Sequence, residues 1–307
     1  MLFRSISSHI AVTNLLTSCL LKNDSLAFCG HQGESAVPEL PDIVVLAESM
    51  DKALRNRLIE DVTVNQPKCL NVSVRRFANQ VRGRRFERSS PRGKWVLSDL
   101  DTKWTLAFNL GMGGEIRLHT KNEEPETKRE RVVLRLDDGQ QVWIHHWWFG
   151  HVHLVPKGHL GSHPQIGRLG QEPLADGFTA DILHHMLEGR RGWIKKYLLD
   201  QSFIAGIGNV YIQDVLWYAR LHPKRSAGSL TRPEVEGLHQ AIQRVLNEGI
   251  SYGGGPGEQD IWGNKGRYQE HFMVGYRTGK ACPECGTPVE ELRVGSTTSY
   301  ICPKCQI

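Results

Sequence analysis

Hydrophobic residues recur every three or four positions after Pro41, and this spacing predicts a helix at the start of the folded part of the chain. The repeating positions are Ile43, Leu46, Met50, Leu54 and Leu58. Pro41 suits the first turn of a helix, because its backbone angle is already helical and its missing N–H has no partner there. Residues 1–37 show only a short apolar patch, so we expect a leader that is disordered or absent from the mature protein.

Apolar and polar residues alternate over 94–155, which predicts a set of strands separated by turns. The alternating segments are "WVLSDL", "TLAFNL", "EIRLHT", "RVVLRL" and "QVWIHHW". Asp138-Gly139 is a strong signal for a hairpin between the last two of them. The pattern therefore predicts a β-rich domain with one leading helix.

The helical spacing returns after about residue 165, where four segments have apolar residues three or four positions apart. These segments are "TADILHHMLEG", "RGWIKKYLLDQ", "NVYIQDVLWYARLHP" and "TRPEVEGLHQAIQRVLNEG". In the last, Thr231 is a suitable N-cap, Pro233 lies in the first turn and Gly249 is expected to end the helix. Residues 251–268 are rich in glycine and predict a mobile loop between domains.

The composition is that of a soluble globular protein, with 39% hydrophobic and 23% charged residues. The net charge of +5 weakly favours a polyanionic partner such as nucleic acid. No apolar run is long enough to span a membrane, so we expect no membrane association. The scattered cysteines Cys19, Cys29 and Cys69 do not form a disulfide framework, which favours a cytoplasmic location, although organelle targeting by the leader stays open.

Two Cys-x-x-Cys pairs near the C-terminus carry the strongest chemical signal. Cys282 and Cys285 are separated by sixteen residues from Cys302 and Cys305. Four thiolates at this spacing suit one tetrahedral Zn²⁺ ion in a closed, structural site. The pairs therefore predict a zinc ribbon, with a redox dithiol as the less favoured alternative.

The segment "FIAGIGNVY" joins two of the predicted helices, and we expect Asn209 to be the N-cap of the second. Such a turn can point free backbone N–H groups and an amide at a phosphate. Its glycines can equally serve only the positive backbone angles of a tight turn. From the residues alone, both interpretations stay open.

The segment "HHWWFGHVH" at 145–153 places Trp147, Trp148 and Phe149 in a row. These aromatic residues could pack in a sheet, or form a wedge that fills the space of an extruded base. The neighbours His145 and His146 face opposite sides of a strand, so we expect solvated strand histidines rather than metal ligands.

Six segments in order resemble one family, the formamidopyrimidine-DNA glycosylase and endonuclease VIII family of base-excision repair. They are "PELPD", "SPRGKW", "LGMGG", "FGHVHLV", "IKKYLLDQSFIAGIGNVYIQD" and "CPECG…YICPKCQ", and they run from Pro38 to Gln306. The resemblance implies an α+β multidomain fold. It has a catalytic β-sandwich with a leading helix (38–160), a helix-two-turn-helix domain (161–268) and a zinc ribbon (269–307).

The resemblance also implies a bifunctional DNA glycosylase and abasic-site lyase, a monomer that acts on damaged double-stranded DNA without a redox cofactor. Pro38 matches the N-terminal proline whose free secondary amine is the nucleophile. Proline inside a peptide bond lacks that basic lone pair, so the leader must be absent from the active protein. Val37 could be a GUG start codon read as valine.

The alternative is a silent damaged-DNA-binding protein whose leader blocks Pro38. A zinc-ribbon nucleic-acid binder of unrelated role is the third hypothesis.

By the same resemblance, Glu39 matches a carboxylic acid that moves protons at the sugar, and Lys94 matches a lysine that reaches the lesion phosphate. The residues that match DNA-binding positions are Met112, Trp147, Phe149, Lys195 and Asn209.

Two positions depart from the family pattern. Trp147 stands where the family has an arginine that contacts the orphaned base, and tryptophan can stack but cannot read a cytosine edge with two hydrogen bonds. Thr297 stands where the family has an arginine that clamps phosphates, a loss for which Arg277 or Lys280 could compensate. We therefore expect weaker opposite-base discrimination and leave the lesion, an oxidised purine or pyrimidine, open.

Overall fold

The computed structural model describes residues 37–147 and 149–307. Trp148 and residues 1–36 of the predicted leader lie outside these ranges. The described part combines a β-sandwich, a group of helices and a C-terminal hairpin, which confirms the predicted α+β fold with three parts. No helix in it has the length and apolar character that a membrane crossing requires.

The sandwich contains eight described strands in the order β5-β7-β6-β1-β2-β3-β4-β8. Neighbouring strands are antiparallel, and β1 pairs with β2 over only two residues, where the two halves of the sandwich join. The strands are β1 (Leu58–Val64), β2 (Arg84–Arg92), β3 (Trp95–Leu100), β4 (Trp104–Asn109), β5 (Glu115–His119), β6 (Glu130–Leu136), β7 (Gln141–His145) and β8 (His151–Pro156). Five of these, β3 to β7, confirm the strands predicted from alternation, and the hairpin turn lies at Asp138-Gly139 as expected.

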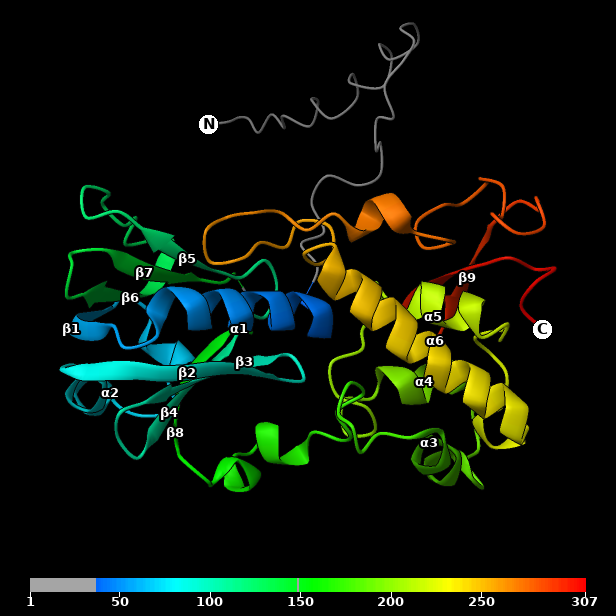
Figure 1. Cartoon of the computed structure of the whole chain (residues 1–307), viewed down its shortest axis with the longest axis horizontal. Coiled ribbons are helices and arrows are strands. Elements are labelled where there is room, and N and C mark those ends of the chain that lie inside the picture. Colours follow the sequence, from blue (N-terminus) through cyan, green and yellow to red (C-terminus); the bar gives the residue numbers. More distant parts are fainter. Residues whose placement is uncertain (1–36, 148) are drawn as a thin grey trace, which may run out of the picture. The chain divides into compact units, whose positions relative to one another are not determined.

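Helix α1 (Leu40–Leu54) is the predicted leading helix, and it packs on β2 and β3 on one side and on α6 on the other (Figure 1). The apolar residues that predicted it are buried, because they form the stripe that faces the sandwich core. Leu58 is the exception, since the helix ends at Leu54 and Leu58 begins β1.

Helix α2 (Val74–Val81), β1 and β2 were not predicted. The sequence of β2, "RRFERSSPR", is largely polar, and only two of its nine residues are buried. Such a strand lacks the apolar alternation on which the prediction depends.

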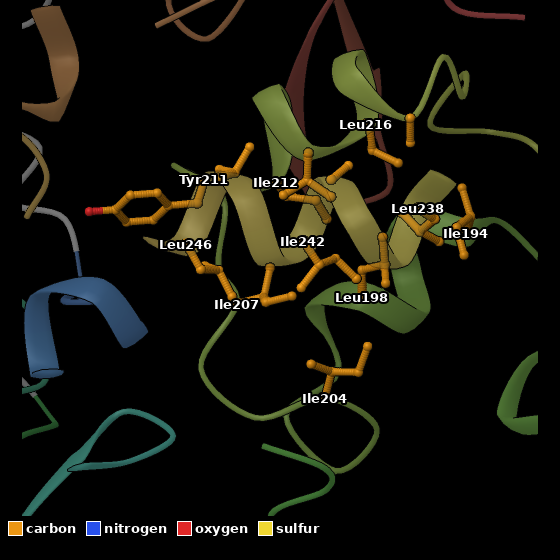
Figure 2. Packing of buried hydrophobic residues seen from close by; sticks show 14 of the residues in the cluster. Ile194, Leu198, Ile204, Ile207, Tyr211, Ile212, Leu216, Leu238, Ile242 and Leu246 are labelled. Atoms are coloured by element: carbon orange, nitrogen blue, oxygen red, sulfur yellow. The ribbon is translucent and has the colours of Figure 1, made fainter. Parts of the chain in front are cut away.

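The four helices predicted after residue 165 are confirmed as α3 (Ala180–Leu187), α4 (Ile194–Leu199), α5 (Ile212–Tyr218) and α6 (Arg232–Ser251). Thr231 is the N-cap of α6, in a capping box with Glu234, but the helix continues past Gly249 to Ser251. Figure 2 shows how aliphatic side chains of α4, α5, α6 and the intervening turn fill one core. Short 3₁₀ helices lie at η1 (Pro67–Cys69), η2 (Leu160–Ser162), η3 (Ile166–Arg168), η4 (Ala227–Ser229) and η5 (Tyr268–His271).

The glycine-rich segment 251–268 is folded against the sandwich. Ile261 is fully buried in the sandwich core, its N–H donates to Ser49 Oγ at 3.2 Å, and its carbonyl accepts from Leu118 N at 2.9 Å. Asp260 accepts the backbone N–H groups of Trp262 and Asn264, which closes the turn. The prediction of a mobile loop is therefore wrong, because this segment is held by a residue that lies 212 positions earlier in the chain, Ser49.

The chain ends in an antiparallel hairpin of β9 (Glu290–Val294) and β10 (Thr297–Ile301). Its small core contains Trp217 of α5 together with Val274, Val289 and two cysteines, Cys282 and Cys302. The hairpin is thus joined to the helical part by packing as well as by the chain.

Candidate active site and metal centre

The segment that opens the described chain lies against the turn between α4 and α5. Leu40 N donates to Gly206 O at 3.0 Å, and both Pro38 and Glu39 are buried. Gly206 has a positive φ of 96°, and a side chain there would meet Leu40. The glycines of this turn therefore allow the two segments to approach closely.

The carboxylate of Glu39 accepts backbone N–H groups from this turn. Gly208 N lies 2.7 Å from Oε2, and Val210 N lies 2.8 Å from Oε1. A third donor, Tyr211 N, lies at 3.4 Å. The N–H groups that the sequence suggested for a phosphate are thus bound to Glu39.

Asn209 is not the predicted N-cap, since α5 begins at Ile212 after Tyr211. The Glu39 side chain, 170 residues away in the chain, binds the N–H groups that a local cap would have taken. Nothing in the local sequence indicates this distant acceptor.

Lys94 lies in the turn between β2 and β3. Its carbonyl accepts from Asn109 Nδ2 at 2.9 Å, and the preceding Gly93 N donates to Glu172 Oε1 at 2.9 Å. The Lys94 amine and the Glu39 carboxyl both lie close to Gly208. A Cβ atom added to Gly208 would lie only 2.6 Å from Lys94 Nζ and 2.3 Å from Glu39 Oε1. Three segments of the chain thus bring the Glu39 carboxyl and the Lys94 amine to the same glycine.

Burial raises the pKa of Glu39 above its usual range, while the Lys94 charge and the N–H groups of Val210 and Gly208 act in the opposite direction. Burial favours the protonated form of this carboxyl and the Lys94 cation favours the ionised form, so the group can both hold and release a proton. This is the behaviour required of a group that moves protons.

Asp42 is a second buried acid at the site that the sequence did not single out. It accepts from Glu39 N at 2.7 Å, from Gly255 N at 2.7 Å and from Tyr211 Oη at 2.8 Å. Burial raises the pKa of Asp42 as well. Its position three residues after Glu39 is that of a capping box, the one local signal that could have identified it.

For the excision activity that the resemblance implies, we predict that Gly208→Ala lowers the rate by about tenfold to a hundredfold. The added methyl must displace Glu39 or Lys94, and overpacking of this kind costs ~1–3 kcal/mol. Single-turnover excision from a damaged duplex measures the effect. Gly177→Ala is the matched control, since its methyl would meet no atom within 4 Å. Equal rates for the two variants would contradict the assigned geometry.

Three predicted DNA-contacting side chains lie together at the surface. Met112, Trp147 and Phe149 are 37%, 57% and 79% exposed, and Trp147 N donates to Met112 O at 3.2 Å. Phe149 has a positive φ of 58°, an uncommon conformation for a bulky residue, and it leaves the ring in solvent. These exposures favour the wedge interpretation over a core position.

The histidines beside this surface are buried, so the prediction of solvated strand histidines is wrong. His145 stacks edge-on against Trp147 with ring centroids 4.7 Å apart. The His146 ring covers Gly150, where any side chain would clash with it. Burial lowers the pKa of His146 to about 4. The two rings thus support the turn that carries the exposed aromatic residues.

The remaining predicted DNA-contacting residues are already held by protein groups. Lys195 is buried, and its Nζ donates to Thr298 O at 2.6 Å and to Ser299 Oγ at 2.7 Å. Gln213 Nε2 lies between Asn209 Oδ1 and Thr298 O, at 3.1 and 3.3 Å. Arg277 donates to two backbone carbonyls of its own loop. Lys195 and Asn209 thus lie close to the hairpin that carries Thr297.

The four C-terminal cysteines form one cluster. The sulfur atoms of Cys282, Cys285, Cys302 and Cys305 all lie within 4.8 Å of one another. Among the described residues this is the only such group of potential ligands. Four thiolates at this separation fit one structural zinc ion, in agreement with the sequence.

We predict one zinc ion per chain and its loss in Cys302→Ser. Because a ribbon this small depends on its metal, the variant is expected to lose the order of the β9–β10 hairpin. Its affinity for DNA should fall in parallel. Metal analysis and a DNA-binding titration measure both effects. Cys69→Ser, which changes a buried cysteine outside the cluster, should keep its zinc. Full zinc content in Cys302→Ser would contradict this assignment.

Comparison with known proteins agrees with this arrangement along the whole described chain. The formamidopyrimidine-DNA glycosylase N-terminal domain matches residues 37–147, and the H2TH domain of the same enzymes matches 169–259. The zinc finger found in FPG and IleRS matches 279–307. Formamidopyrimidine-DNA glycosylase of Chloroflexus aurantiacus is 40% identical over 278 residues, covering 88% of this chain and 98% of the relative. The chain belongs to the formamidopyrimidine-DNA glycosylase family.

Other members of the formamidopyrimidine-DNA glycosylase family show the same extent of similarity. The Desulfitobacterium hafniense enzyme is 36% identical over 274 residues, covering 88% of this chain and 100% of its own. The Lactococcus lactis Fpg, solved in complex with abasic-site DNA, superimposes with a TM-score of 0.82 at 26% identity. That alignment covers 88% of this chain and 99% of the other. The matched ranges follow the order of the three predicted domains, whose limits stay predictions.

Proposed function

We propose that the protein is a bifunctional DNA glycosylase and abasic-site lyase that removes oxidised bases from double-stranded DNA. The observation that carries this proposal is the convergence of the Glu39 carboxyl and the Lys94 amine at Gly208, next to Pro38. Family membership supports it, and Fpg of Lactococcus lactis has been solved with abasic-site DNA and with oxidised-pyrimidine DNA.

In this proposal the nitrogen of Pro38, as a free secondary amine, forms a bond to C1′ of the damaged nucleotide. The bond between C1′ and the base breaks, and the base leaves with the electron pair and gains the proton that the Pro38 nitrogen loses. Opening of the sugar ring, with a proton from Glu39 to the ring oxygen, gives a cationic Schiff base between Pro38 and C1′. The raised pKa of Glu39 suits it to supply that proton.

The cationic Schiff base then acidifies the proton on C2′. Its removal by a base expels the 3′ phosphate oxygen, which is β-elimination and cleaves the strand. Lys94 is proposed to bind the lesion phosphate, a role that the position of its amine at the same glycine as Glu39 supports. Water finally releases the sugar fragment and restores the free amine.

The exposed Met112, Trp147 and Phe149 are proposed to fill the space that the extruded nucleotide leaves in the duplex. Stacking by Trp147 contributes ~1–3 kcal/mol and is nearly independent of sequence. We therefore expect weak discrimination of the opposite base. Lys195 and Asn209, beside the C-terminal hairpin, are proposed to contribute to phosphate binding.

Base release from an oxidised duplex tests this function. A chain that begins at Pro38 is incubated with duplexes that contain 8-oxoguanine or an oxidised pyrimidine, and the freed base is quantified by mass spectrometry. Release of either base with strand cleavage is expected. Tight binding of damaged DNA without any base release would instead favour a silent damage-binding protein, the second hypothesis from the sequence.

A further inference from the structure

Gln213 is a buried amide of α5 that the mechanism above does not use. It is 1% exposed and lies between Asn209, in the turn before α5, and strand β10 of the C-terminal hairpin. Its Nε2 donates to Asn209 O at 2.7 Å, to Asn209 Oδ1 at 3.1 Å and to Thr298 O at 3.3 Å. Its Oε1 accepts from Tyr300 N at 3.1 Å. A buried amide with this many partners is held in one orientation.

The direction of the Gln213 amide is fixed by backbone groups of β10. The Tyr300 N–H can only donate, so the atom of Gln213 that faces it must be the oxygen. The Thr298 carbonyl can only accept, so the atom that faces it must be the amide nitrogen. The two ends of this amide therefore cannot be exchanged without the loss of both hydrogen bonds.

The orientation of Gln213 determines that of the Asn209 amide. Because Gln213 presents its nitrogen, the atom of Asn209 that accepts from it must be Oδ1, which leaves the Nδ2 group with its two N–H donors on the other side. Asn209 is half-buried, and its Nδ2 has no hydrogen-bond partner among residues 37–147 and 149–307. This nitrogen is also not enclosed by the protein, so it is open to a ligand. Amide N–H groups bind phosphate oxygens, whereas a carbonyl oxygen in the same place would repel them.

We propose that Gln213 is a positioning residue that orients the Asn209 amide, so that Nδ2 donates to a DNA phosphate and Oδ1 is turned away from it. This inference rests on the proposed function, which assigns Asn209 to phosphate binding. The backbone of β10 sets the direction of both amides. The C-terminal hairpin thus controls a DNA contact that a residue of the helical part makes.

The competing explanation is that Gln213 only joins α5 to the hairpin. Its hydrogen bonds to Thr298 and Tyr300 would then support the position of β10, and its effect on DNA binding would not pass through Asn209. The two explanations predict different results when the Asn209 side chain has already been removed.

The test is a double-mutant cycle on DNA affinity. The chain that begins at Pro38 is titrated with a duplex that contains a tetrahydrofuran analogue of the abasic site, which lacks the C1′ hydroxyl and cannot form a Schiff base. Asn209→Ala is expected to weaken binding about tenfold, the effect of one lost hydrogen bond to a charged group. Gln213→Met keeps the shape of the side chain but offers no N–H, and it is expected to weaken binding about threefold to tenfold. In the Asn209→Ala background, Gln213→Met should weaken binding no further.

A spectroscopic measurement reports on the Asn209 amide itself. In protein with nitrogen-labelled asparagine, the Nδ2–H signals of Asn209 are identified by their absence in Asn209→Ala. They should shift when the duplex is added to the unchanged protein, and shift much less in Gln213→Met. Gln243→Met is the matched control, because Gln243 is a half-buried glutamine of α6 that donates to Pro173 O and has no bond to Asn209 or β10. It should bind the duplex as the unchanged protein does.

Equal losses from Gln213→Met with and without the Asn209 side chain would overturn the inference, since Gln213 would then act through the hairpin alone. Normal binding by Gln213→Met would overturn it as well. If Gln213→Met lost its cooperative unfolding, Asn209→Asp would decide. Its carboxylate still accepts from Gln213 but turns its second oxygen toward the phosphate, so it should bind more weakly than Asn209→Ala, and equal binding by the two would contradict the assigned orientation.

Failure of the proposed function gives a different result. Normal binding by Asn209→Ala would remove the phosphate contact itself, and the role of Gln213 with it. A full effect of Asn209→Ala with additive losses would instead remove only the role of Gln213. Absence of base release by the unchanged protein is measured separately and concerns the chemistry rather than this contact.

Discussion

Glu39→Gln is expected to lower base excision by about two to four orders of magnitude, the usual contribution of a positioned proton donor. The substitution removes the only proton of the carboxyl, and its amide group would face the N–H of Gly208 or Val210, which needs an acceptor. Since burial raises the pKa of Glu39, excision by the unchanged protein should fall only as pH rises through that raised value. Single-turnover excision across a pH series measures both effects.

Two controls separate a chemical effect of Glu39→Gln from misfolding. Thermal unfolding of the variant should remain cooperative, with a Tm below that of the unchanged protein only by the effect of one buried N–H that loses its acceptor. Affinity for an abasic-site duplex should be retained. Trapping on an abasic site should fall less than excision, because the base is already absent. If Glu39→Gln excised the base at the rate of the unchanged protein, Glu39 would have no part in the mechanism.

Local sequence patterns predicted most of the regular structure. The spacing of apolar residues identified α1 and the four later helices, and alternation identified β3 to β7. Both patterns succeed where one face of an element is buried and the other is exposed. They fail for β2, whose residues are mostly polar, and for 251–268, where glycine content suggested mobility. Ile261 is buried there by contacts with Ser49 and Leu118, which local composition does not report.

Less of the candidate site could be predicted from local sequence patterns. Pro38, Glu39 and Lys94 came from resemblance to a family, because no spacing rule connects two short segments so far apart in the chain. The bond from the turn at Gly208 to Glu39 depends on tertiary structure alone. The cysteine cluster was predictable, as metal ligation requires a fixed spacing.

Pro38→Gly is expected to lower the yield of the Schiff-base adduct strongly when the chain begins at that position. Glycine supplies a primary amine on a flexible backbone, whereas proline supplies a secondary amine whose condensation with C1′ is necessarily cationic. The buried position of Pro38 beside Glu39 holds that nitrogen at the site. Retaining residues 1–37 uncleaved should abolish the adduct at this position, because the nitrogen of Pro38 is then an amide with no basic lone pair.

Borohydride trapping on an abasic-site duplex tests the central proposal most directly. The chain that begins at Pro38, its Pro38→Gly variant and the full chain are each incubated with the duplex and reductant, then separated on a denaturing gel. The account predicts a covalent protein–DNA adduct in high yield for the first chain, much less for the Pro38→Gly variant and none at Pro38 for the full chain, with mass spectrometry locating the link at Pro38. No adduct from the first chain, with DNA binding intact, would contradict the account and identify a protein that binds damage without cleaving it.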